Sequence, residues 1–118
     1  MKQYMYLLWE TPGSFAKMSP EDMQKILERY NGWFGKVAQT GRLQLGHKLT
    51  EEGGKWVTKQ KDRLNSVDGP YAETKEVIGG IFIATADSYD DAVRFVADCP
   101  ALDFGRVEVR EVDPTPPK

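Results

Sequence analysis

Three side chains in this sequence are candidates for acid–base chemistry: Asp68, His47 and Lys75. A carboxylate at the mouth of a cleft can accept a proton or orient a substrate hydroxyl, which makes Asp68 a candidate base. Histidine is the residue type that changes charge near neutral pH, and His47 is the only one in the chain. A lysine partly withdrawn from water can act as a base or bind an anion, which is the role considered for Lys75.

Each candidate also has a purely structural interpretation. An aspartate that precedes a glycine commonly accepts hydrogen bonds from its own turn, so Asp68 could simply shape a loop. A lone histidine on the apolar face of a strand is often a hydrogen-bonded structural residue, and the pattern around His47 also fits that role. The sequence leaves both interpretations open.

The segment that begins at Asp68 could bind a polar ligand, and an aromatic ring elsewhere could add a flat apolar wall. The predicted ligand contacts are Gly69, Pro70, Tyr71, Glu73, Glu76 and Trp33. Charged loop residues are most often simply solvated, which is the alternative for the two glutamates. Packing in the core or against a second subunit would equally explain the tryptophan.

No metal or cofactor is expected. One histidine and one cysteine cannot assemble the usual nitrogen and sulfur zinc site. The pair Gly79-Gly80 lacks both the Walker spacing and the dinucleotide fingerprint, and we expect it to permit a close backbone approach at the start of a strand. Cys99 precedes a proline with no histidine near it in sequence, which indicates a small buried residue and not a nucleophile.

Length and composition narrow the classes of partner. The 118 residues, 40% of them hydrophobic, suit one core, so we expect one domain over residues 1–112 and a proline-rich tail over 113–118. A net charge of -2 provides no basic field for nucleic acid, and no apolar run approaches the roughly 18 residues of a membrane span. The single cysteine and the lack of a signal-peptide pattern predict a cytoplasmic protein.

Hydrophobic periodicity predicts two βαβ halves. Strands are expected over residues 4–9, 43–49, 78–86 and 106–112, with a polar hairpin over 55–60 and 63–67. Ser19 followed by Pro20 predicts the start of a long helix, whose apolar stripe continues in phase past Asn31-Gly32. Ser88 and Asp91 indicate a capping box for a second helix.

This order of elements predicts an α+β fold, a ferredoxin-like antiparallel sheet with both helices on one face and an inserted hairpin. In the strand over residues 43–49, His47 is expected on the same buried face as the leucines. The strands over 4–9 and 78–86 are apolar on both faces, so one face needs a cover other than the helices. The simplest cover is a second copy of the chain, which predicts a homodimer in the form of a dimeric α+β barrel.

Residues 68–76, with the sequence DGPYAETKE, are followed by Gly79-Gly80 and resemble the signature of the DGPF proteins, a branch of the YCII-related family. The resemblance extends over residues 4–112 and includes Gly41-Arg42-Leu43 and Asp91-Ala92. It implies a dimeric α+β barrel. It also implies a catalytic pair of a histidine on the first helix and a later aspartate, but this chain has Tyr30 near the histidine position.

Three hypotheses for function follow. The first is a small-molecule site in a cleft between the sheet and the loop over residues 68–76, with acid–base chemistry through Asp68 and either His47 or Lys75. The second is a non-enzymatic regulatory or protein-interaction module, which the resemblance links to transcription dependent on sigma factors. The third is a purely structural dimer.

Overall fold

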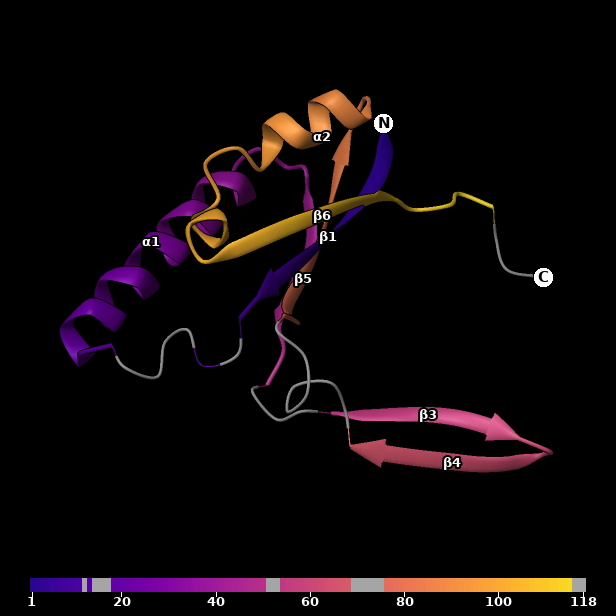
Figure 1. Cartoon of the computed structure of the whole chain (residues 1–118). Helices are drawn as coiled ribbons and strands as arrows, with labels where there is room; N and C mark the ends of the chain where they lie inside the picture. Colours follow the sequence, from indigo (N-terminus) through magenta and orange to yellow (C-terminus); the bar gives the residue numbers. More distant parts are fainter. Residues whose placement is uncertain (12, 14–17, 51–53, 69–75, 116–118) are drawn as a thin grey trace.

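The computed structural model describes residues 1–11, 13, 18–50, 54–68 and 76–115 (Figure 1). The helices and strands in chain order are β1 (Lys2–Glu10), α1 (Pro20–Ala38), β2 (Leu43–Lys48), β3 (Lys55–Gln60), β4 (Arg63–Asp68), β5 (Val77–Ala86), α2 (Tyr89–Phe95), the short 3₁₀ helix η2 (Pro100–Asp103) and β6 (Gly105–Glu111).

Four of the strands form one antiparallel sheet in the order β2-β5-β1-β6. The strands β3 and β4 pair only with each other and form a separate two-stranded sheet. Both helices lie on one side of the main sheet (Figure 1). The predicted α+β fold, with an antiparallel sheet, two helices and a separate hairpin, is therefore confirmed.

The long helix α1 begins where its capping residues predict. The Ser19 hydroxyl accepts a hydrogen bond from the Asp22 backbone N–H at 3.1 Å, and Pro20 occupies the first helical position. The helix continues through Asn31-Gly32 because Trp33 and Val37, which follow this pair, are buried in the core.

Aromatic rings fill the core between the sheet and the helices. Tyr6 from β1 stacks on Phe82 from β5 with ring centroids 4.4 Å apart, and Trp33 packs edge-on against Phe82 at 5.5 Å. The buried Tyr6 hydroxyl donates a hydrogen bond to the Ala92 carbonyl oxygen at 2.8 Å. Each aromatic pair adds about 0.5–1.5 kcal/mol beyond its buried area. The sheet, α1 and α2 are thus joined through one aromatic cluster.

The opposite face of the sheet is also apolar. Tyr4 and Tyr6 point to the helices and are fully buried, so the alternating Met5 and Leu7 point away from them. In the register of the sheet, Met5 lies opposite Ile83 and Leu7 lies opposite Ile81. We call the surface formed by these four residues and Leu45 the uncovered face.

One prediction about β2 is wrong. Its leucines and His47 do not share a buried face, because the register shifts between Leu43 and Leu45. Leu43 packs against the core, whereas Leu45 lies opposite Ile83 and His47 lies opposite Ile81, on the uncovered face. The irregularity has the effect of a β-bulge, which re-aims the side chains that follow it.

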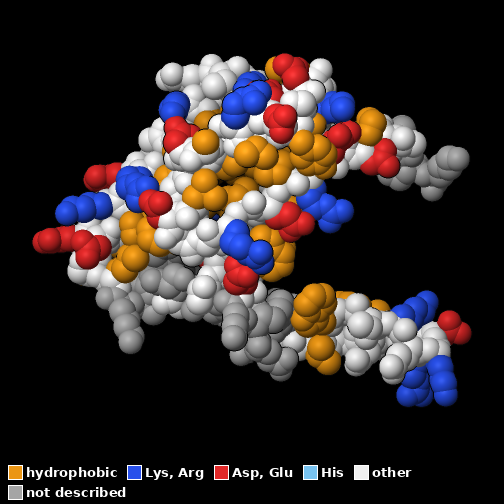
Figure 2. Space-filling view, turned by 45° about the horizontal axis from the view of Figure 1, so that its top comes forward, with side chains coloured by type: hydrophobic (Ala, Val, Ile, Leu, Met, Phe, Trp, Pro, Cys, Tyr) orange, Lys and Arg blue, Asp and Glu red, His pale blue; other side chains and the backbone are white. Residues whose placement is uncertain are grey.

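The hairpin formed by β3 and β4 matches the predicted ranges within one residue and projects away from the main sheet (Figure 1). Lys61 and Asp62 both have positive φ angles, of 49° and 68°, as the two central residues of a type I′ turn do. Figure 2 shows hydrophobic side chains toward the base of the hairpin and basic ones at its tip. Trp56 and Leu64 expose 56% and 76% of their surfaces.

Candidate functional site

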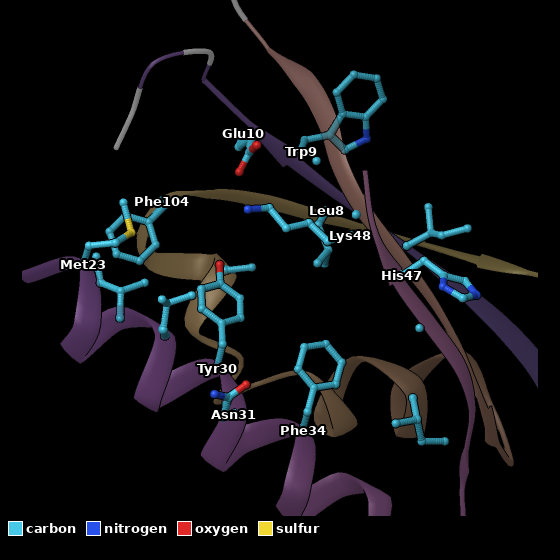
Figure 3. Close-up of a pocket in the computed structure, with 18 residues that line it drawn as sticks. Leu8, Trp9, Glu10, Met23, Tyr30, Asn31, Phe34, His47, Lys48 and Phe104 are labelled. Carbon is cyan, nitrogen blue, oxygen red and sulfur yellow. The ribbon is translucent and has the colours of Figure 1, made fainter. Parts of the chain in front are cut away.

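A cavity of about 410 Å³ lies between α1 and one end of the main sheet (Figure 3). Most of its walls are apolar side chains from α1, with others from β1 and from the chain around η2. Its main apolar lining residues are Leu8, Met23, Ile26, Leu27, Phe34 and Phe104. A cavity of this volume and polarity is typical of a site for a small organic molecule.

Three polar side chains point into the same part of the cavity: Glu10, Lys48 and Tyr30 (Figure 3). Glu10 is the last residue of β1, Lys48 is the last residue of β2, and Tyr30 lies in the middle of α1. The main sheet and the helix packed on it therefore bring a carboxylate, an ammonium group and a phenol to one edge of the cavity. We call Glu10, Lys48 and Tyr30 the polar rim.

The Tyr30 hydroxyl is a neutral hydrogen-bond donor. Burial raises the pKa of Tyr30 to about 12, with smaller contributions in the same direction from Cys99 and Glu10. The hydroxyl thus stays protonated at neutral pH. It can donate a hydrogen bond to a ligand oxygen inside the cavity.

Glycines at the start of β5 make room for the rim. A Cβ atom at Gly79 would overlap the Glu10 carboxylate, and one at Gly80 would lie 3.2 Å from the His47 carbonyl oxygen. The predicted close backbone approach is confirmed at Gly80, whereas the neighbour of Gly79 is a side chain. At Gly79 the missing side chain leaves a notch over the strand in which the Glu10 carboxylate rests.

Two of the predicted catalytic residues lie away from the polar rim. His47 contributes to the cavity wall, but its imidazole points away from the cavity (Figure 3). Asp68 is the last residue of β4, its carboxylate is 90% exposed, and it forms an ion pair with Lys55 at 2.6 Å. The third predicted catalytic residue, Lys75, lies outside the described residues.

The predicted ligand contacts lie in several different places. Glu76 forms a bidentate ion pair with Arg106, at 2.8 and 2.9 Å. Trp33 lies in the core, where its indole N–H donates to the Asp98 carboxylate at 2.9 Å. The other predicted contacts lie outside the described residues: Gly69, Pro70, Tyr71 and Glu73. Of the predicted ligand contacts that the structure describes, none lines the cavity.

Comparison with known proteins identifies the family. The model of the YCII-related domain matches residues 2–115, which is nearly the whole chain. The chain belongs to the YCII-related domain family. A search for similar curated proteins finds no match.

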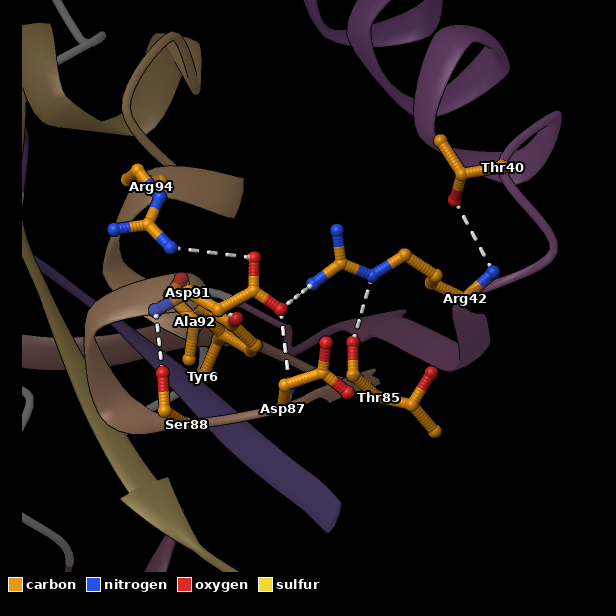
Figure 4. Close-up of polar contacts among 9 residues, drawn as sticks. All are labelled: Tyr6, Thr40, Arg42, Thr85, Asp87, Ser88, Asp91, Ala92 and Arg94. Carbon is orange, nitrogen blue, oxygen red and sulfur yellow. Dashed lines mark hydrogen bonds and ion pairs between the residues drawn. The ribbon is translucent and has the colours of Figure 1, made fainter. Parts of the chain in front are cut away.

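A second polar cluster in this YCII-related chain joins β2 to α2 (Figure 4). The Arg42 guanidinium donates to the Thr85 carbonyl oxygen and to the Asp91 carboxylate, both at 2.9 Å, and lies 4.6 Å from the centre of the Phe95 ring. Asp91 also accepts a hydrogen bond from the Asp87 backbone N–H at 3.0 Å. The motifs Gly41-Arg42-Leu43 and Asp91-Ala92 therefore meet in space, in a structural role.

The sequence did not single out Glu10 or Lys48 as site residues. They come from different strands far apart in the chain, so no local spacing marks them. Tyr30 lies near the position where the family resemblance implies a histidine, and the structure places it on the cavity wall.

The described residues give little support for a metal site, a membrane-spanning helix or a cysteine nucleophile. Within that part of the chain, no group of three or more histidine, cysteine or acidic residues could hold a metal ion, and no helix is long and apolar enough to cross a membrane. Cys99 is buried, as predicted, and burial raises the pKa of its thiol. A raised pKa leaves less thiolate at neutral pH, which makes Cys99 a poor nucleophile.

Proposed function

We propose that this YCII-related protein binds a small organic molecule with an apolar body in the cavity between α1 and the sheet. One observation carries the proposal: a cavity of about 410 Å³ has apolar walls and three polar side chains converging at one rim. Known ligand sites combine such walls with a few well-placed polar groups that orient the ligand.

We place the polar part of this site at Glu10, Lys48 and Tyr30 in preference to a cleft beside Asp68. The Asp68 carboxylate is exposed and pairs with Lys55, whereas the three rim residues line a cavity with largely apolar walls. Electrostatic and hydrogen-bonding interactions are stronger beside apolar walls than in open water. The rim is therefore the better place for acid–base chemistry.

Two further proposals concern the family branch and the assembly. The segment over residues 68–76 and the glycine pair after it support membership in the DGPF branch. The uncovered face supports a homodimer in which a second copy packs its own uncovered face against the first, giving a barrel-like pair of sheets. This assembly keeps the cavity on the opposite side of each sheet.

Binding in the cavity can be tested with the neutral fluorescent probe N-phenyl-1-naphthylamine. Leu27 lines the cavity from α1 and is 47% exposed, so Leu27→Trp can fill part of the cavity without disturbing the core. We expect this variant to bind the probe at least about tenfold more weakly than the wild type, which corresponds to about 1.4 kcal/mol.

Leu64→Trp is the matched control, because it makes the same change on the exposed hairpin. It should bind the probe as the wild type does. Equal affinity in the wild type and Leu27→Trp would contradict binding in the cavity, and a loss confined to Leu64→Trp would place the probe on the hairpin.

One feature favours a second candidate function, that of a protein-interaction module. Trp56, Val57 and Leu64 on the hairpin are all more than half exposed, and soluble proteins rarely project so many apolar side chains without a partner. Replacing Trp56 and Leu64 by serine would weaken a complex made through the hairpin, whereas Leu27→Trp would leave it unchanged. The two functions therefore respond to different variants.

A further inference from the structure

The charges at the rim of the cavity favour an uncharged ligand. Glu10 contributes one negative charge and Lys48 one positive charge to the same part of a largely apolar cavity. An anionic ligand would place a second negative charge beside Glu10, and a cationic ligand would place a second positive charge beside Lys48. Like charges close together repel, so a neutral polar group fits the rim best.

The donors at the rim favour an oxygen atom on that neutral group. Lys48 carries three N–H donors, and Tyr30 contributes a hydroxyl that stays protonated. Two donors at the same rim, one of them cationic, can stabilise an oxygen more as negative charge develops on it. A carbonyl oxygen that becomes an enolate oxygen has this behaviour.

The remaining rim residue, Glu10, carries a carboxylate that could act as a base. The Glu10 carboxylate rests in the notch over Gly79 and points into the cavity beside the two donors. A carboxylate held next to a bound substrate, in apolar surroundings, is a common general base for removing a proton from carbon. The rim thus holds one base and two stabilisers of a developing oxyanion.

We infer that the cavity takes a neutral carbonyl compound with an apolar body and moves a proton at the carbon next to its carbonyl group. This inference rests on the proposed function, since it names the class of substrate for the same cavity. In the first step the C–H bond breaks, its proton passes to a Glu10 carboxylate oxygen, and its electron pair forms the enolate held by Lys48 and Tyr30. The carboxyl proton of Glu10 then exchanges with solvent. In the second step Glu10 gives a proton, or a deuteron in D₂O, to carbon at the same or a conjugated position, and the carbonyl re-forms.

The test uses 2-tetralone, a neutral bicyclic ketone, with the full-length protein in D₂O. Proton NMR follows the loss of the signals from the carbons next to the carbonyl as deuterium replaces hydrogen. We expect the wild type to accelerate this exchange over buffer. Glu10→Gln should lower the acceleration by about 100-fold or more, the usual effect of removing a general base.

The donors are tested by Tyr30→Phe and Lys48→Met, each of which should lower the exchange rate by about 100-fold while changing the dissociation constant for 2-tetralone only a few-fold. Glu28→Gln is the matched control for Glu10→Gln, because Glu28 is an exposed residue of α1 that bonds only Gln24 among the described residues. It should exchange 2-tetralone at the wild-type rate. Lys59→Met on the hairpin serves in the same way for Lys48→Met.

The outcomes separate the inference from the proposed function. If 2-tetralone binds and Leu27→Trp weakens its binding, but exchange stays at the rate in buffer, the inference fails and the binding site stands. Exchange that is unchanged in Glu10→Gln would also overturn the inference. If neither 2-tetralone nor N-phenyl-1-naphthylamine binds in a manner sensitive to Leu27→Trp, the proposed function fails as well.

Discussion

At the scale of single residues, Gly105 occupies a position that no other residue fits. It begins β6 opposite Glu10, and a Cβ atom there would overlap the Trp9 carbonyl oxygen, which is backbone and cannot swing aside. We expect Gly105→Ala to lower the free energy of unfolding by about 1–3 kcal/mol, the usual cost of overpacking, as measured by urea denaturation.

Gly32→Ala is the control for this prediction. Gly32 lies inside α1, and a Cβ atom there would meet open space. Alanine should therefore raise the free energy of unfolding by about 0.5–1 kcal/mol through its helix propensity. Equal effects of the two substitutions would show that β6 does not approach β1 as described.

Asp98 links α1 to the chain that follows α2, and it predicts a pH dependence. A hydrogen bond from Lys36, and a smaller contribution from the Trp33 hydrogen bond, lower the pKa of Asp98. Because the folded pKa is lower than the unfolded one, this carboxylate stabilises the fold above about pH 4, and the contribution disappears as the pH falls through the folded pKa.

Urea denaturation of the wild type and Asp98→Asn should therefore show a difference in stability at pH 7 that shrinks at pH 3. Asp62→Asn, at the exposed hairpin turn, controls for the loss of one carboxylate. A wild-type advantage that stays constant between the two pH values would contradict the role given to Asp98.

The place of Glu10 and Lys48 at the cavity could not be predicted from the sequence. Asp68 and His47 are candidates from sequence because their residue types and local patterns indicate acid–base chemistry. Glu10 and Lys48 have no such pattern, and only the antiparallel packing of β1, β5 and β2 brings the ends of their strands to one side of a cavity. The proximity of Glu10 and Lys48 therefore cannot be predicted without knowing how the strands pair.

At the scale of the elements, the Arg42–Asp91 pair fastens the start of β2 to the start of α2. Both side chains are largely withdrawn from water, and Asp91 accepts hydrogen bonds from Arg42 and from the Asp87 backbone. Asp91→Ala would leave these donors without their acceptor, which costs about 1–3 kcal/mol.

Thermal or urea denaturation can measure this cost against Asp90→Ala. Asp90 is the exposed neighbour of Asp91 in the first turn of α2, and its loss should change stability by no more than about 0.5 kcal/mol. If both variants lose the same stability, the pair does not fasten the two elements.

The ends of the helices were well predicted, and the phase of β2 was not. Ser19 and Ser88 each accept the backbone N–H three residues ahead, because capping depends on local chemistry that the sequence displays directly. The carboxylate of Asp91 departs from the simple capping box by accepting from Asp87. The register shift after Leu43 depends on pairing with β5, so alternation alone placed His47 on the wrong face.

At the scale of the whole molecule, the uncovered face predicts association. Ile83→Glu places a charge in the middle of this face, and we expect it to convert a dimer into a monomer in sedimentation at micromolar concentration. Val93→Glu, on the exposed surface of α2, should leave the dimer intact. A wild type that sediments as a monomer would contradict the dimer.

The architecture was predictable from sequence because hydrophobic residues recur with the spacing of a strand in some segments and of a helix in others. These segments follow one another in the order of two βαβ halves. Residues 4–9 and 78–86, expected to be apolar on both faces, became the central strands β1 and β5. The cavity was not predictable, because it arises where α1 and one end of the sheet leave space between them.

The most direct test of this account is an NMR titration of ¹⁵N-labelled protein with N-phenyl-1-naphthylamine. We predict that the largest shifts of backbone amide signals come from Phe34, Gly46 and Gly80, which line the cavity. Shifts confined to Leu7 and Ile83 would place the molecule on the uncovered face instead, and would contradict a ligand site between α1 and the sheet.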